Sequence, residues 1–156
     1  MQQIRSFVHL TSRARQLSQN DRCFLLETFS LLMGVRLGLW LLSFERLCKV
    51  LEGVSHPSLG VCSASLSSQQ LVQRVIWGVE ASCKRMPGTV KCLARALTVK
   101  VLLARSNCDS KLVIGVAKNP LQQLEAHAWV ELQGRVVIGQ LPDLDRFTPL
   151  PTLPQL

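Results

Sequence analysis

Apolar residues recur at helical spacing in the first part of the chain and alternate with polar residues in the last part. The stretch 22–51 is rich in Leu and interrupted by Gly34 and Gly38. This pattern predicts a long helical segment that begins at a cap formed by Asn20 or Asp21. Residues 1–20 before it are polar and basic, which indicates a short helix or an arm.

A composition break and two further helices are predicted next. Residues 53–68 are loaded with Gly, Ser and Pro and indicate a loop or linker. A helix over residues 69–84, started by Ser67 or Ser68, would present one apolar stripe to a core: Leu71, Val75, Val79 and Cys83. Pro87-Gly88 should end that helix, and another helix is expected over residues 90–105.

After Asn107 the period changes from helical to alternating, which predicts strands over residues 111–117, 126–132 and 135–139. Gln133-Gly134 is expected to be a tight turn. The proline-rich tail from Pro142 onward is expected to wrap over the surface without regular structure. Helices followed by an antiparallel sheet indicate an α+β domain. We divide the chain into a helical part, residues 1–55, and a core, residues 66–156.

The N-terminal helical part carries more apolar surface than a small domain can cover. Residues 28–44 are nearly all apolar around Arg36, and a central Arg would be costly in a bilayer, so a buried or partner-covered helix is expected. Arg46 and Lys49 leave peripheral association with lipid head groups as an alternative. A docking surface for a partner is predicted at four leucines: Leu25, Leu32, Leu39 and Leu42.

Composition limits the choice of partners. The chain has 156 residues, 47% of them hydrophobic, which suits one domain with a proper core. Its 18 Lys and Arg against 10 Asp and Glu give a net charge of +8, which favours acidic partners. Nucleic acid is not expected, because aromatic residues are few, Tyr is absent and no dense basic run occurs. No phosphate-binding glycine loop occurs, and no cofactor is expected.

The cysteines do not form a metal-binding or disulfide pattern. No CxxC pair, zinc-ligand spacing or secretory signal accompanies them, which predicts reduced thiols in a cytoplasmic protein. Most of the six cysteines are interpreted as packing residues. The six are Cys23, Cys48, Cys62, Cys83, Cys92 and Cys108.

Cys92 is the candidate nucleophile, because it would lie in the first turn of the helix that follows Pro87-Gly88. Unpaired N–H groups and the helix dipole at that position stabilise a thiolate and can receive an oxyanion. On position alone, a packing role remains the alternative.

His127 is the candidate general base. In an extended AHAWVEL strand, Ala128 and Val130 face the core, whereas His127 and Trp129 face the other side. A histidine that only hydrogen-bonds a neighbour is the alternative. His9 and His56 lie in the predicted arm and loop.

A third group usually fixes the imidazole tautomer. A two-residue turn would place Gln140 opposite His127, and a three-residue turn would leave the role to Asp143, or to Asp145. The sequence leaves these alternatives open.

The segments PGTVKCLARALTVKVLLAR, KLVIGVA and EAHAWVELQGRVVIGQ together resemble the lasso peptide maturation proteases of the transglutaminase-like, papain-related superfamily. The resemblance covers nearly the whole chain and suits the standalone form of that protease. It implies removal of a leader from a ribosomally made precursor peptide, together with a small leader-recognition protein. An ATP-dependent cyclase would then act on the freed core. It also implies that Cys92 is the nucleophile and His127 the base.

The sequence departs from this family at the third catalytic position. The family's Asp commonly lies about twelve residues after the His, and Gly139 stands there in this chain. Gln140 or Asp143 would then substitute, or the enzyme would work as a dyad. Two other functions stay open: a non-catalytic scaffold subunit of the maturation complex, and a thiol acyltransferase.

Overall fold

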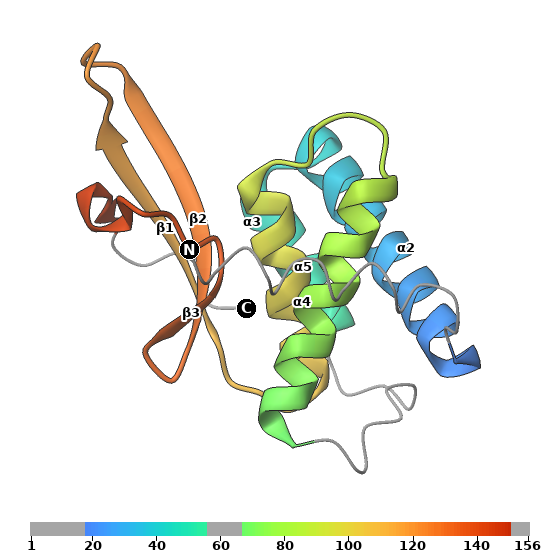
Figure 1. The fold of residues 1–156 in the computed structure, drawn as a ribbon. Helices are drawn as coiled ribbons and strands as arrows, with labels where there is room; N and C mark the ends of the chain where they lie inside the picture. Colours follow the sequence, from blue (N-terminus) through green and yellow to red (C-terminus); the bar gives the residue numbers. More distant parts are fainter. Residues whose placement is uncertain (1–17, 56–66, 151–156) are drawn as a thin grey trace.

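The computed structural model describes residues 18–55 and 67–150. Within them, helices come first and a small antiparallel sheet follows, so the predicted α+β class is confirmed. Figure 1 shows the helices on one side and the sheet on the other. Residues 1–17 of the predicted N-terminal arm, with His9, lie outside the described residues, as do His56 and Cys62.

The predicted long N-terminal helix is two helices, α2 (Gln19–Leu41) and α3 (Phe44–Val54). The N-cap of α2 is Ser18, whose Oγ accepts the N–H of Asn20 at 3.2 Å, so the predicted cap was wrong. The glycines do not break the helix. A Cβ on Gly38 would lie 2.5 Å from Leu47 Cδ1 of α3, so the glycine lets α3 fold back closely against α2.

Helices α4 (Ser68–Arg85) and α5 (Cys92–Arg105) agree with the sequence prediction. Ser67 caps α4 in a reciprocal capping box with Gln70, which satisfies two backbone N–H groups. Helix α5 begins two residues later than predicted, with Lys91 as its N-cap. Cys92 is therefore the first residue of the helix.

The sheet has the strand order β3-β2-β1-β4, built from β1 (Lys111–Lys118), β2 (Leu124–Leu132), β3 (Arg135–Ile138) and β4 (Thr148–Pro149). The predicted tight turn is confirmed, and it is the two-residue alternative, because Leu132 pairs with Arg135 across Gln133-Gly134. The tail prediction was wrong for its described part. Residues 144–146 form a 3₁₀ turn, η2 (Leu144–Arg146), and β4 pairs with the middle of β1.

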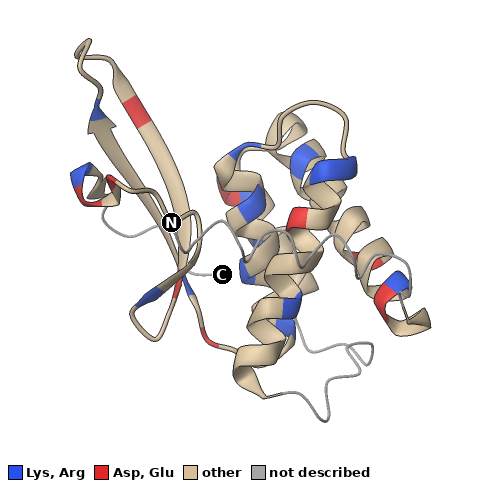
Figure 2. Cartoon of the chain, viewed as in Figure 1, with Lys and Arg blue, Asp and Glu red and all other residues tan. Residues whose placement is uncertain are grey.

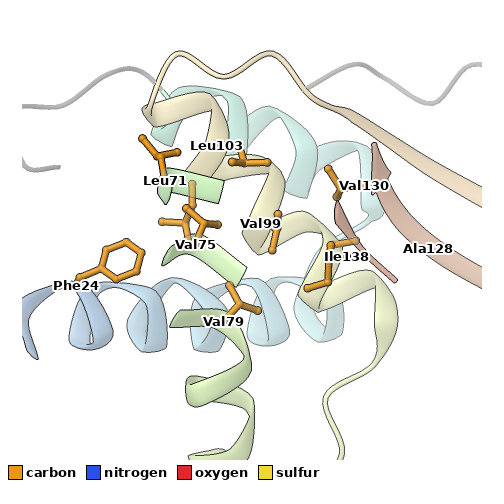
Figure 3. Packing of buried hydrophobic residues seen from close by; sticks show 11 residues of the cluster. Phe24, Leu71, Val75, Val79, Val99, Leu103, Ala128, Val130 and Ile138 are labelled. Atoms are coloured by element: carbon orange, nitrogen blue, oxygen red, sulfur yellow. The ribbon is translucent and has the colours of Figure 1, made fainter. Parts of the chain in front are cut away.

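Helix α5 is the centre of the core. Its residues from Ala96 to Leu103 are all buried, and it packs on α2 and α4 at one side and on the sheet at the other. Figure 3 shows one cluster that joins all these layers. Its members come from α2, α4, α5, β2 and β3: Phe24, Leu71, Val75, Val79, Ala96, Val99, Leu102, Leu103, Ala128, Val130 and Ile138. Helix α2 thus shares a core with the C-terminal part of the chain. The division into residues 1–55 and 66–156 stays a prediction.

A second cluster lies on the sheet face that points away from the helices. It consists of Val113, Ala117, Trp129 and Phe147. Gly115 makes room for it, since a Cβ there would lie 2.8 Å from the Trp129 indole and 3.0 Å from Phe147 Cβ. The predicted alternation along β2 is thereby observed, with Ala128 and Val130 on the helix side and Trp129 on the other.

The leucines predicted to form a docking surface are not a common exposed face. Leu32 is 0% exposed, and only Leu42 of the four is exposed. The large apolar side chains that α2 exposes are different ones: Leu26, Leu37, Trp40 and Leu41. Helix α2 is long and apolar enough to cross a membrane, but core helices of soluble proteins pass the same test. The arrangement is compatible with a soluble protein.

Two leucines on opposite faces of α2 allow a test of which face of the helix is buried. Leu32→Ala should lower the free energy of unfolding by about 2–5 kcal/mol, because it leaves a cavity in a fully buried site. Leu26→Ala, at a side chain 68% exposed, should change it by less than about 0.5 kcal/mol. Urea denaturation measures both, and similar losses would contradict this placement of α2.

Lys100 of α5 predicts a pH dependence of stability. Its side chain is buried and donates to the Ser110 carbonyl. Burial lowers the pKa of Lys100 below its ordinary value, and Asp109 only partly opposes this. Between the folded pKa and the ordinary pKa, the unfolded chain therefore binds more protons than the folded one, and stability rises with pH.

The unfolding free energy of the wild type should therefore increase relative to Lys100→Met as pH rises toward the ordinary lysine pKa. This difference should be lost as pH falls through the lowered pKa. Parallel urea titrations of the two proteins across alkaline pH measure it. A difference that stays constant would show that Lys100 does not titrate differently on folding.

Candidate active site

Cys92 occupies the N-terminus of the central helix. The first backbone hydrogen bond of α5 runs from Arg95 N–H to the Lys91 carbonyl at 3.3 Å. The N–H groups of residues 92–94 therefore have no acceptor within the helix, and the helix dipole adds partial positive charge there. The Cys92 side chain is half-buried. This end of α5 can stabilise a thiolate or an oxyanion.

Arg36 fastens the loop that leads into Cys92. Its Nη1 donates to the Pro87 carbonyl at 2.9 Å, which joins α2 to the α4–α5 loop. Met86 anchors the same loop, because it is buried with Leu32 and Leu97 in a third cluster on the helix side of the molecule. Arg36, the charged residue of the apolar stretch 28–44, thus has a structural partner, which the sequence alone did not indicate.

His127 lies on β2 opposite Gly115 of β1, with its ring on the face of the second cluster. The imidazole stacks with Trp129 at a centroid distance of 6.2 Å and an interplanar angle of 18°. The Phe147 ring also lies beside the imidazole, with the ring centroids 5.6 Å apart. Two aromatic rings therefore limit how far the imidazole can turn.

The imidazole is held by a backbone carbonyl. His127 Nε2 lies 2.7 Å from the Gly139 oxygen. A carbonyl oxygen only accepts, so in the neutral ring Nε2 carries the hydrogen and Nδ1 carries the lone pair. The residue at the family's Asp position thus contacts the histidine with its backbone, and Nδ1 is the nitrogen able to accept a proton.

A β-bulge produces this contact. Glu131 pairs with Val136, but Val130 pairs with Ile138, so the register shifts by one residue between them. Gly139 then leaves the strand with a φ of +87°, in the left-handed region that favours glycine. A Cβ there would lie 2.8 Å from the Ala128 oxygen. Sequence reasoning missed this role because a bulge depends on packing against β2.

The two predicted third residues have other partners. The side-chain amide of Gln140 donates to the Leu141 carbonyl at 3.2 Å. The Asp143 carboxylate accepts from Arg146 Nε at 2.6 Å. Among the described residues, the side-chain hydrogen bond of the imidazole is the one to Gly139. The assignment of Gln140 or Asp143 as the third catalytic residue stays a prediction.

The structure brings the elements bearing Cys92 and His127 together without joining the two side chains. Cys92 packs against the cluster that contains Ala128 and Ile138, the chain neighbours of His127 and Gly139. His127 stacks instead with Trp129 of the second cluster, on the other face of the sheet. No hydrogen bond links the Cys92 sulfur to the imidazole in the described residues. Strand β3 ends at Ile138, so the edge of β2 beside His127 has no ladder partner there.

Two other thiols of the described residues are poor candidates for a nucleophile. Burial raises the pKa of the Cys83 thiol, and burial followed by Glu52 raises that of Cys48. A raised pKa keeps a thiol protonated and a poor nucleophile at neutral pH. The described residues hold no group of three or more His, Cys, Asp and Glu side chains that could bind a metal.

The backbone demand at Gly139 can be tested against a matched glycine. Gly139→Ala should destabilise by about 1–3 kcal/mol more than Gly134→Ala. Both have positive φ, but a Cβ at Gly134 meets no atom within 4 Å, whereas at Gly139 it meets the β2 backbone. Urea denaturation of the two variants gives the difference, and equal losses would exclude the close approach to β2.

Comparison with known proteins agrees with this arrangement. A family model for the transglutaminase-like superfamily matches residues 38–152, from the last turn of α2 to beyond β4. The match does not single out the lasso peptide proteases within it. No curated protein and no solved structure matches the chain. Since the match covers most of the sequence, the chain belongs to the transglutaminase-like superfamily, whose members are typically cysteine-peptidase-like enzymes.

Proposed function

We propose that the chain is a cysteine peptidase in which Cys92 is the nucleophile and His127 the general base. One observation carries the proposal. The His127 ring is oriented by the Gly139 carbonyl at the edge of the strand on which the Cys92 helix packs. Superfamily membership supports the same chemistry, of cysteine peptidase or acyl-transfer type.

The free edge of β2 gives the imidazole a route to the thiol. Because β3 ends at Ile138, a ring held beside Gly139 can present Nδ1 past the edge toward the face where Cys92 packs. Catalytic hydrogen bonds are often long in a free enzyme and shorten when substrate binds. The proposal therefore requires substrate to draw the Cys92 sulfur and His127 Nδ1 together.

The reaction follows from these groups. Nδ1 takes the thiol proton, and the thiolate attacks the carbonyl carbon of the scissile peptide bond. Backbone N–H groups of residues 93 and 94 stabilise the oxyanion. The imidazolium then donates its proton to the leaving amine, which leaves a thioester on Cys92. Water, deprotonated by Nδ1, hydrolyses the thioester and restores the thiol.

A carbonyl replaces the usual carboxylate in this scheme. The Gly139 oxygen fixes the tautomer and orientation of His127, but it carries no full charge to stabilise the imidazolium. Of the alternatives left by the sequence, this favours a Cys–His dyad over a triad completed by Gln140 or Asp143.

The substrate is proposed from the sequence motifs. The resemblance of CLARAL and AHAWVE to the lasso peptide proteases suggests the leader of a ribosomally made precursor as the segment removed. The partners would be a separate leader-recognition protein and an ATP-dependent cyclase. The basic net charge of +8 suits an acidic leader or partner.

The test combines the purified chain with precursor peptide and recognition protein and follows release of the core by mass spectrometry. Cys92→Ala should reduce cleavage by about 10³-fold or more, because it removes the nucleophile. The matched control is Cys83→Ala, since Cys83 is also half-buried and packs against the same cluster. Unchanged cleavage by Cys92→Ala would refute the proposal.

The same assay distinguishes dyad from triad. His127→Ala should abolish cleavage, whereas Gln140→Ala and Asp143→Asn should each change kcat/KM by less than about threefold, well below the loss expected for a group that orients the base. A loss above about 10²-fold in either variant would identify it as the third catalytic group.

Product analysis distinguishes hydrolysis from the alternative functions. A thiol acyltransferase would pass the acyl group of the Cys92 thioester to an added primary amine in preference to water. Capture of the amine as the main product would favour that function. A scaffold subunit would bind the precursor and release no core peptide even as the wild type.

A further inference from the structure

The outer face of α2 is a continuous apolar stripe. We define the outer stripe as Leu26, Leu37, Trp40 and Leu41, whose exposed fractions are 68%, 49%, 81% and 67%. Leu37, Trp40 and Leu41 are spaced i, i+3 and i+4, so they are neighbours on the helix surface. The part of this face between Leu26 and Leu37 carries Ser30, Met33 and Gly34, which add no charge. Such a stripe on one helix marks a docking surface.

The opposite face of α2 holds the helix in the domain. Its buried residues are Phe24, Thr28, Leu32, Val35 and Gly38. Three of them, Phe24, Leu32 and Val35, belong to the two core clusters that also contain α5 side chains. Insertion of α2 across a bilayer would remove these side chains from the core. The stripe can therefore meet a surface, but α2 cannot span a membrane while the domain stays folded.

Two acidic residues of α2 form ion pairs with the helices packed against it. Asp21 pairs with Arg74 of α4 at 3.1 Å, and Glu27 pairs with Arg105 of α5 at 2.6 Å. From residue 28 to residue 41 the helix contains no acidic residue. The outer stripe is thus free of negative charge.

Basic residues adjoin the C-terminal end of the stripe. Arg46 and Lys49 are exposed on α3, which packs back on α2, and Lys84 and Arg85 are exposed at the end of α4. The Arg36 contact with Pro87 ties that end of α4 to α2. Figure 2 shows Lys and Arg gathered at this end of the helical layer. They outnumber the two exposed acidic residues of α3, Glu45 and Glu52.

We propose that the outer stripe docks the protein peripherally on a bilayer with anionic head groups, independently of the proposed peptidase function. Helix α2 lies in the plane of the interface, with Trp40 and its neighbouring leucines at the boundary of head groups and acyl chains. Arg46, Lys49, Lys84 and Arg85 face the anionic head groups, where each basic residue strengthens binding.

A lipid surface suits the stripe better than a second copy of the chain does. Docking two copies through this face would bring together two proteins of net charge +8 with like-charged residues beside the contact. Anionic lipid attracts the same residues. A single convex helix with a protruding Trp also fits a fluid surface without needing a matching groove.

The test is co-sedimentation of the full chain with vesicles at low ionic strength. Vesicles of phosphatidylcholine with about 30% phosphatidylglycerol should bind the wild type, and phosphatidylcholine alone should bind it at least about tenfold more weakly. Trp40→Gln/Leu41→Gln should weaken binding to the anionic vesicles by at least about tenfold, because two apolar side chains lose their burial. Arg46→Gln and Lys49→Gln should each weaken it by about fivefold.

The matched control is Leu121→Gln/Leu124→Gln in the β1–β2 hairpin, whose side chains are 77% and 73% exposed. This double variant should bind like the wild type. Absence of wild-type binding to anionic vesicles would overturn the proposal, as would equal losses in both double variants. A dimer in sedimentation velocity that Trp40→Gln/Leu41→Gln dissociates would assign the stripe to a second copy instead. Thermal unfolding of each variant confirms that it remains folded.

Discussion

The burial of α5 between two layers is the constraint on which the rest of the structure depends. This one helix packs α2 and α4 at one side and the sheet at the other, and its residues from Ala96 to Leu103 are withdrawn from water. Each fully buried aliphatic side chain contributes roughly 1.5–3 kcal/mol. Because the helix is fixed along its length, its first residue, Cys92, has a fixed place against the core cluster that α5 shares with β2.

The sheet meets this helix with an arrangement built around two glycines. Gly115 leaves space for the Trp129 indole beside His127, and Gly139 brings a backbone carbonyl against the imidazole. Neither position accepts a Cβ without displacing its neighbours. The orientation of the histidine is thus set by backbone and aromatic packing, whereas the lasso peptide protease pattern that the sequence resembles has a carboxylate. A neutral carbonyl can fix a tautomer, but it stabilises an imidazolium less than a carboxylate does.

Helix α2 shows how one element can serve two surfaces. Its inner face belongs to the same core as the sheet, and its polar contacts also point inward, including the Arg36 bond that holds the loop before Cys92. From Leu26 to Leu41, the outer face consequently keeps apolar side chains without charge. The position of Cys92 and the exposed stripe therefore depend on the same packing of α2 against α4 and α5.

The sequence by itself determined the α+β class, a helix with Cys92 in its first turn, the position of the hairpin turn and the two faces of β2, because each follows from local periodicity or turn chemistry. Only the tertiary structure decided which face of α2 is buried, where the bulge falls and that Gly139 contacts His127. A nearly uniform apolar helix has no clear phase in its sequence, and a bulge depends on packing between strands. The partners of the candidate catalytic residues were therefore the part that sequence could not supply.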